Sequence, residues 1–222
     1  MSRFLHPRYA GLEAYTPGEQ PRDRQYIKLN TNESPYPPSP AVLAALTEQD
    51  LADLRLYSDP EGTALRAKLA ELYGVEAGQV FLSNGSDDIL NFAFMAFGAD
   101  GAVFPALTYS FYPVFANLHG VAYETVPLRE DFTLDVAGMQ GKGKLTVFPN
   151  PNAPTGIALP LDQLEAIVAS NPDHVVVVDE AYVDFGADSA VPLLQKYENL
   201  LVVMTYSKSR SMAGARLGFA LG

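Results

Sequence analysis

Apolar residues in this chain occur in two patterns, short continuous runs and helically spaced positions. Residues 175–178 and 200–204 are continuous runs rich in valine and leucine, typical of strands buried on both faces of a sheet. Leu65, Leu69 and Leu72 recur at helical spacing, which predicts a helix over residues 63–73 that Gly74 would end. The alternation of the two patterns indicates an α/β protein.

The same reasoning predicts the order of elements along the rest of the chain. Strands are expected at residues 80–82, 102–104, 121–126, 145–148, 175–178 and 200–204, and helices at 86–97, 111–118 and 161–169. Strands that alternate with helices favour a three-layer α/β/α arrangement around a mainly parallel sheet.

Domain boundaries follow from composition. Prolines exclude helix from much of residues 1–40, which are therefore expected to form an extended arm, followed by a short helix. Residues 41–222 are expected to form one large domain. Its last residues, 215–222, resemble a strand just completed, so we expect the domain to be incomplete at its C-terminus and a small C-terminal domain to be absent.

Charge and composition exclude several classes of function. The 222 residues have a formal net charge of −11, which disfavours binding to nucleic acids or anionic membranes. Cysteine is absent, and His6, His119 and His174 are scattered without metal-ligand spacing, so neither a thiolate nucleophile nor a metal site is expected. No segment approaches the roughly 20 apolar residues that span a bilayer, and we expect a cytoplasmic protein.

Reactive side chains follow two neighbouring predicted strands. Asp179 comes directly after one run, and Lys208 follows the next, with Arg216 a little further along. Ligands of open α/β sheets bind at the carboxyl ends of such strands. The acid could instead cap a helix and the lysine could be solvated, but an acid, an amine and a guanidinium at one sheet edge suit a cofactor bound as a Schiff base. No G-x-x-x-x-G-K-[ST] motif is present to indicate nucleotide binding.

Two further segments lie at the same expected edge. Gly85 joins a predicted strand to a helix that begins with Ser86 and Asp87, and helix N-termini bind phosphate readily. The alternative is that Ser86 or Asp87 merely caps the helix. The turn that contains Asn152 is rich in proline and asparagine, so it is either a plain rigid turn or a polar rim around a ligand.

Several motifs together resemble the fold-type I aminotransferases. They are Asn152-Ala153-Pro154-Thr155-Gly156, Asp179-Glu180-Ala181-Tyr182, Ser207-Lys208 and Gly214-Ala215-Arg216-Leu217-Gly218. Residues 29–36, 57–60, 84–87 and 108–112 are similar, in order and spacing, to the histidinol-phosphate aminotransferases. The resemblance runs from about Leu29 to the end of the chain.

The resemblance implies pyridoxal 5′-phosphate as the cofactor. Lys208 would form the Schiff base and transfer the proton, and Asp179 would pair with the pyridine nitrogen. Tyr182 and Asn152 would contact the phenolic oxygen, although this chain has Ala153 where many relatives have a second asparagine, so that contact falls to Asn152 or is lost.

Further roles are implied for the rest of the site. Tyr109 would stack on the pyridine ring, Tyr57 would reach the cofactor phosphate of a neighbouring subunit in a homodimer, and Asn32 would lie near the substrate. The cofactor phosphate would be bound by Arg216, Thr205, Ser207, Gly85, Ser86 and Asp87.

The expected reaction transfers an amino group between histidinol phosphate and 2-oxoglutarate in histidine biosynthesis. An aromatic aminotransferase or a threonine-phosphate decarboxylase is the alternative within the same family. A different class of function is a non-catalytic, truncated relative that binds only the cofactor or a partner subunit.

Overall fold

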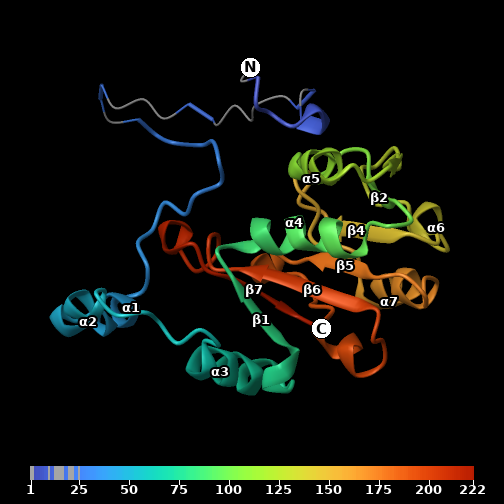
Figure 1. The fold of residues 1–222 in the computed structure, drawn as a ribbon. Helices are drawn as coiled ribbons and strands as arrows, with labels where there is room; N and C mark the ends of the chain where they lie inside the picture. Colours follow the sequence, from blue (N-terminus) through green and yellow to red (C-terminus); the bar gives the residue numbers. More distant parts are fainter. Residues whose placement is uncertain (1–2, 10, 13–17, 20–22, 25) are drawn as a thin grey trace.

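The computed structural model describes residues 3–9, 11, 12, 18, 19, 23, 24 and 26–222 (Figure 1). The α-helices are α1 (Pro40–Ala45), α2 (Glu48–Asp53), α3 (Thr63–Tyr73), α4 (Ser86–Phe97), α5 (Phe111–His119), α6 (Val136–Met139) and α7 (Leu161–Ala169). The strands are β1 (Val80–Ser83), β2 (Ala102–Pro105), β3 (Tyr123–Val126), β4 (Leu145–Pro149), β5 (Val176–Asp179), β6 (Leu200–Thr205) and β7 (Gly218–Leu221). The 3₁₀ turns are η1 (Pro7–Tyr9), η2 (Ala77–Gln79), η3 (Val183–Phe185), η4 (Val191–Gln195) and η5 (Ala213–Ala215).

The strands form one seven-stranded sheet in the order β1-β7-β6-β5-β4-β2-β3. The neighbours from β3 through β2, β4 and β5 to β6 are parallel, whereas β7 is antiparallel to both β6 and β1. The sheet is therefore mainly parallel, as the alternating pattern predicts. Asp179 pairs with Val203 in the register of β5 and β6, so the segments that follow these strands start side by side.

Hydrophobic cores lie on both faces of the sheet. Val176 and Val178 of β5 pack in a cluster with residues of α3, α6 and α7, while Val177 packs in a second cluster with residues of α4 and α5. Successive strand residues thus face opposite layers, which explains the continuous apolar runs. The three-layer α/β/α fold is confirmed.

Most predicted element bounds agree with the structure. The predicted strand at residues 121–126 begins later, at Tyr123, because the amide of Val121 still donates to the carbonyl of Ala116 at the end of α5. The single short helix expected after Pro40 is two helices. Thr47 separates them by capping α2 in a reciprocal pair of hydrogen bonds with Asp50.

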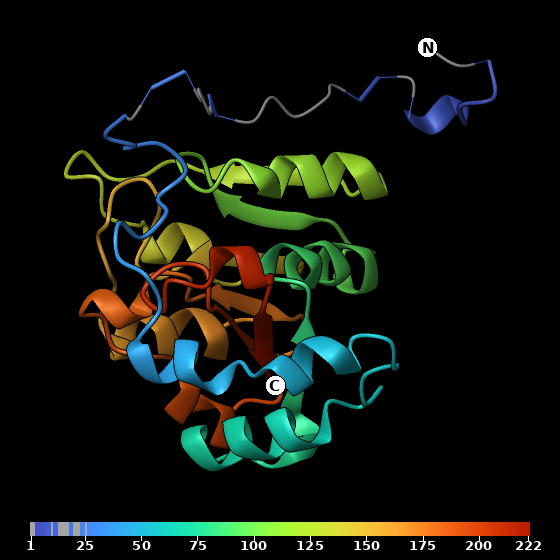
Figure 2. The same ribbon diagram turned by 90° about the vertical axis from the view of Figure 1, so that its left-hand side faces the viewer.

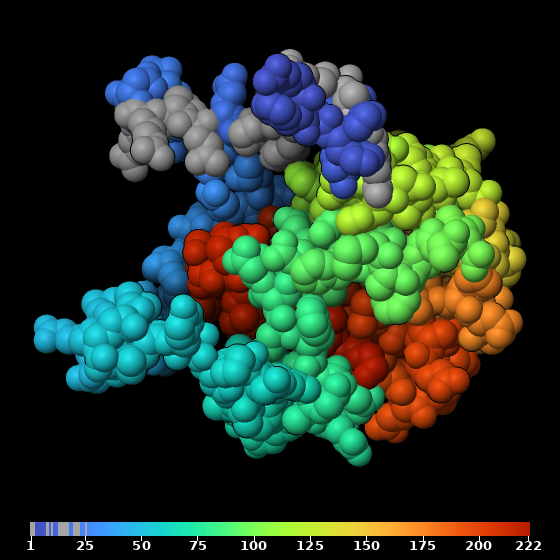
Figure 3. Space-filling model, viewed as in Figure 1, coloured from blue at the N-terminus to red at the C-terminus, as the bar shows by residue number. Residues whose placement is uncertain are grey.

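The expected arm, residues 1–40, falls partly outside the described residues. Residues 26–39 run without helix or strand down one side of the domain to α1 (Figure 2). Helices α1 and α2 stand out from the body of the domain and have no buried residue (Figure 3). Among the described residues, no helix is both long enough and apolar enough to cross a membrane.

Candidate functional site

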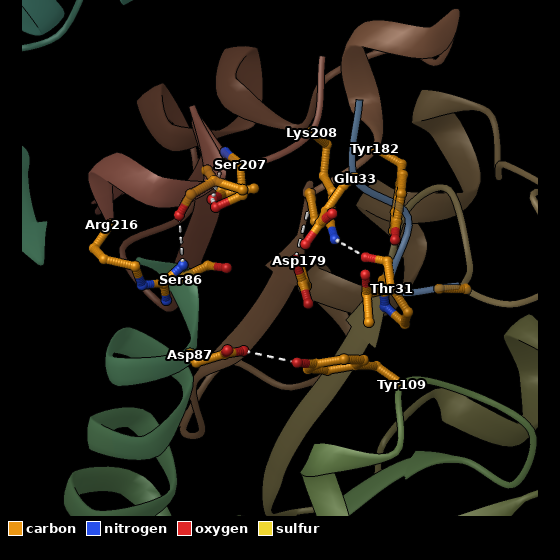
Figure 4. A pocket seen from close by; sticks show the side chains of 15 residues that line it. Thr31, Glu33, Ser86, Asp87, Tyr109, Asp179, Tyr182, Ser207, Lys208 and Arg216 are labelled. Atoms are coloured by element: carbon orange, nitrogen blue, oxygen red, sulfur yellow. Dashed lines mark hydrogen bonds between the residues drawn. The ribbon is translucent and has the colours of Figure 1, made fainter. Parts of the chain in front are cut away.

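A cavity of about 220 Å³ opens where the carboxyl ends of β5 and β6 meet the beginning of α4 (Figure 4). Its walls come from six separate segments of the chain. The lining residues are Thr31, Glu33, Ser86, Asp87, Tyr109, Pro149, Ala153, Asp179, Ala181, Tyr182, Thr205, Ser207, Lys208, Ala213 and Arg216. The edge predicted from the strand ends is therefore a real cavity.

Asp179 is the last residue of β5, and its carboxylate is only 4% exposed. One carboxylate oxygen accepts a hydrogen bond from the hydroxyl of Tyr112 at 2.9 Å, and the other accepts from the amide of Ala181 at 3.1 Å. Burial raises the pKa of Asp179 to about 6, although both hydrogen bonds oppose the rise. A cationic group bound beside this carboxylate would relieve the cost of its burial.

Lys208 reaches into the cavity from the loop that follows β6 (Figure 4). Its Nζ donates to the carbonyl oxygen of Thr31 at 3.2 Å and lies 5.7 Å from the centre of the Tyr182 ring. The hydroxyl of Tyr182 accepts a hydrogen bond from the side-chain amide of Asn32 at 2.8 Å. The arm therefore crosses the cavity beside the lysine.

The opposite end of the cavity lies at the N-terminus of α4, next to Arg216. Gly85 has a φ of 88°, and an added Cβ there would lie 2.5 Å from Nη2 of Arg216, so a side chain at this position would displace the guanidinium. Arg216 itself adopts a left-handed φ of 54°. A non-glycine residue in this conformation is strained, and such strain is often retained at functional sites.

Two hydroxyl side chains and an aromatic ring complete the walls. Thr205 donates through its hydroxyl to that of Ser207 at 3.0 Å and accepts from the Ser207 amide at 3.1 Å. The hydroxyl of Tyr109 donates to Asp87 at 2.9 Å, which ties the segment before α5 to the first turn of α4.

Four of the predicted residues, Gly85, Asn32, Tyr57 and Asn152, are not among those that line this cavity. Asn152 donates to the carbonyl of Leu107 and to Thr155, and lines an adjacent hollow together with Asn32 and Tyr182. Asn32 contacts the site through its hydrogen bond to the hydroxyl of Tyr182. Tyr57 lies apart from the cavity with its side chain fully exposed.

The structure also brings residues to the site that sequence reasoning missed. Thr31 and Glu33 line the cavity, and Tyr112, which does not line it, donates a hydrogen bond to Asp179 from the core. Tyr112 lies in α5, three residues beyond Tyr109, and only the packing of α5 on the sheet brings its hydroxyl to Asp179. Nothing in the sequence pattern points to Thr31, because its part in the site is a backbone carbonyl.

The fold and the cavity define a class of protein. Residues 24–222 match the model of the family described as aminotransferase class I and II, and the chain belongs to this family. The chain is 52% identical to the histidinol-phosphate aminotransferase of Brachyspira hyodysenteriae over 100% of its own length and 64% of the relative. It is 54% identical to that of Syntrophus aciditrophicus over 99% of its own length and 63% of the relative.

A solved structure shows the same fold. The histidinol-phosphate aminotransferase of Sinorhizobium meliloti, solved in complex with pyridoxal-5′-phosphate, is 28% identical and superposes with a TM-score of 0.78. The match covers 86% of this chain and 55% of that one. The resemblance stated from the motifs is confirmed, and the chain spans less than two thirds of the relatives that it matches.

Proposed function

We propose that this chain carries the cofactor site of a pyridoxal phosphate-dependent aminotransferase that exchanges an amino group between histidinol phosphate and 2-oxoglutarate. The observation that carries the proposal is the order of groups within one cavity. A buried carboxylate, Asp179, lies at one end, the amine of Lys208 stands at the wall, and Arg216 lies with the N-terminus of α4 at the other end.

The charges at the two ends of the cavity are complementary to those at the two ends of this cofactor. Pyridoxal phosphate is an anion at its phosphate and a cation at its ring nitrogen. The start of α4, next to Arg216, has the positive dipole end and the guanidinium that a phosphate requires. Asp179 offers the cationic nitrogen a buried negative charge. Thr205 and Ser207, which also line the cavity, would add hydroxyl contacts to the phosphate.

When bound, pyridoxal phosphate supplies a carbonyl carbon for amines and a ring that accepts electron density from the reacting carbon. The protein's own part is to hold and move protons. Nζ of Lys208 would take the proton from the α-carbon of the amino donor and return it, acting first as base and then as acid. Asp179 would keep the ring nitrogen protonated by its negative charge.

The tyrosines and Asn152 would position the ring. Tyr109, at the floor of the cavity in Figure 4, would stack on it, and Tyr182 would contact its phenolic oxygen. Asn152 would need to give up its bond to Leu107 or Thr155 to share in that contact. Asn32 would lie near the substrate because it already contacts Tyr182.

The substrate assignment rests on relatives that are 52% and 54% identical to this chain and are named histidinol-phosphate aminotransferases. An aromatic amino donor or a threonine-phosphate decarboxylation remains the alternative. An amino-donor series resolves them, because the donor that converts the cofactor's absorption band fastest identifies the substrate class.

A cytoplasmic homodimer is also part of the proposal. Helices α1 and α2, with the segment that follows them, expose Leu46, Leu51, Leu54 and Tyr57, an apolar surface that a second copy of the chain would cover. Tyr57 would then reach the phosphate of the partner's cofactor.

Borohydride reduction of the purified protein tests the cofactor site. The protein should be yellow, and reduction followed by peptide mapping should place the cofactor on Lys208. Lys208→Ala should abolish both the label and turnover, whereas Lys196→Ala, which removes an exposed lysine paired with Glu165, should change neither. A colourless protein without label contradicts the proposal. Label on Lys208 without conversion by any donor would indicate a chain that binds the cofactor but does not turn over.

A further inference from the structure

The phenol of Tyr112 is wholly buried beneath the cavity. Tyr112 lies in the first turn of α5, its side chain is 0% exposed, and its ring packs against Phe94 and Phe104 in the core above the sheet. Its hydroxyl is the polar tip of an otherwise apolar cluster, and it donates to Asp179 at 2.9 Å. A buried phenol requires a partner, and here the partner is the acid of the cofactor site.

The direction of this hydrogen bond has a chemical consequence. A hydroxyl that donates to a carboxylate stabilises the ionised form. Among the groups that oppose the burial of Asp179, the Tyr112 hydroxyl is the strongest, ahead of the Ala181 amide. The same contact raises the pKa of Tyr112, after burial itself, well above its usual range, so the phenol keeps its proton and remains a donor.

Other charged groups around Asp179 do not replace this contact. Lys208 lowers the pKa of Asp179 by less than either hydrogen bond does, and Asp87 on α4 raises it. The carboxyl of Glu180 is occupied elsewhere, with Ser189 and the Ala190 amide. Tyr109 directs its hydroxyl to Asp87. The α5 side of Asp179 therefore depends on Tyr112.

We propose that Tyr112 is a positioning residue for the cofactor: its hydroxyl orients the carboxylate of Asp179 and keeps it ionised for the cationic ring nitrogen. The inference rests on the proposed function, since it specifies how that function's acid is held. It assigns a role to a core residue that neither lines the cavity nor reaches the reacting atoms.

Tyr112→Phe tests the role, because it removes one hydroxyl and leaves the ring packing in place. Affinity for pyridoxal phosphate, measured without amino donor from about pH 5 to about pH 9, should fall roughly tenfold near neutral pH. As pH falls, affinity should decline once Asp179 takes up a proton. In Tyr112→Phe this decline should begin about one pH unit higher than in wild type, because Asp179 without its donor is protonated more readily.

Tyr197→Phe is the matched control. Tyr197 also donates its hydroxyl to a carboxylate, that of Glu165, at 2.9 Å, but it lies away from the cavity. Its loss should leave both the affinity and its pH dependence unchanged. If Tyr112→Phe behaves like Tyr197→Phe, the proposal is overturned.

Testing Tyr112→Phe in the Asp179→Asn variant distinguishes a positioning role of Tyr112 from a general loosening of the core. In Asp179→Asn, the side chain no longer titrates, so adding Tyr112→Phe should change cofactor affinity by less than about twofold. An equal loss with and without the Asp179 carboxylate would mean that Tyr112 acts through packing alone, which overturns the proposal.

A measurement without cofactor distinguishes failure of this inference from failure of the proposed function. The deficit in unfolding free energy of Tyr112→Phe should grow as pH rises from about 5 to about 8, because the variant pays more to ionise Asp179. The deficit of Tyr197→Phe should stay flat over that range. If wild type binds no pyridoxal phosphate, the proposed function fails, but the increase of this stability deficit with pH still reports on the Tyr112–Asp179 contact. A deficit for Tyr112→Phe that does not change with pH refutes the contact.

Discussion

The guanidinium of Arg216 occupies the space that a side chain at Gly85 would require: an added Cβ at Gly85 would lie 2.5 Å from Nη2 and 3.2 Å from the guanidinium carbon. Two segments far apart in the sequence thus meet at one end of the cavity. Glycine at this position is what allows the arginine to lie against the start of α4.

Gly85→Ala should therefore displace Arg216 and weaken the affinity for pyridoxal phosphate roughly tenfold or more, the effect of losing a charge-assisted contact. Alanine at a positive φ is itself strained. Gly74→Ala is the control, since Gly74 has a φ of 67° but no atom near an added Cβ. Equilibrium binding compares the two, and equal affinities would show that Arg216 has no part in holding the cofactor.

Gly218→Ala should destabilise the fold, because its Cβ would lie 2.4 Å from the carbonyl carbon of Gly85 and 2.5 Å from the amide nitrogen of Ser86. Both are backbone atoms and cannot rotate away. We expect a loss of about 1 to 3 kcal/mol or more in urea unfolding. Gly214→Ala, at a position with open space around it, should cost far less, and comparable losses would contradict this packing.

Glu180→Gln should change how stability depends on pH. Glu180 is 2% exposed, and burial raises its pKa to about 7 even though Ser189 and the Ala190 amide donate to it. An acid whose folded pKa is raised contributes stability that is full below its unfolded pKa and is lost as pH rises through the folded value. Wild type should thus lose up to roughly 1.4 kcal/mol per pH unit from this residue between about pH 4 and pH 7.

In Glu180→Gln the contribution of Glu180 to the slope of unfolding free energy against pH should disappear, and the contribution of Asp179 should remain. The amide can still accept from Ala190 and donate to Ser189. Unfolding measured across that pH range checks the difference, with Glu130→Gln as an exposed control. Identical slopes in wild type and Glu180→Gln would refute the raised pKa.

Leu51→Gln combined with Leu54→Gln should weaken the proposed homodimer. Both leucines are largely exposed on or next to α2, at 66% and 78%. Sedimentation equilibrium should show dissociation to monomers at concentrations where wild type is dimeric. Leu72→Gln, an equally exposed position on α3, should not shift the equilibrium. A wild type that is monomeric, or a double variant that dimerises as well, rejects this interface.

The sequence alone determined most of the local structure. The helices Thr63–Tyr73, Ser86–Phe97 and Leu161–Ala169 have the bounds that their patterns predict, because helical periodicity and glycine stops act within a few residues. Asp179 and Lys208 could be placed at one sheet edge for a related reason, since parallel strands present their carboxyl ends together.

Only the tertiary structure decided the contacts between distant segments. The insertion of β7 between β1 and β6 depends on pairing across most of the chain, and the bond from Asn32 to Tyr182 joins residues 150 positions apart. The apolar pattern predicts Tyr112 to be a core residue, and only the packing of α5 on the sheet brings its hydroxyl to Asp179. Such contacts are set by packing between layers, which leaves no periodic trace in the sequence.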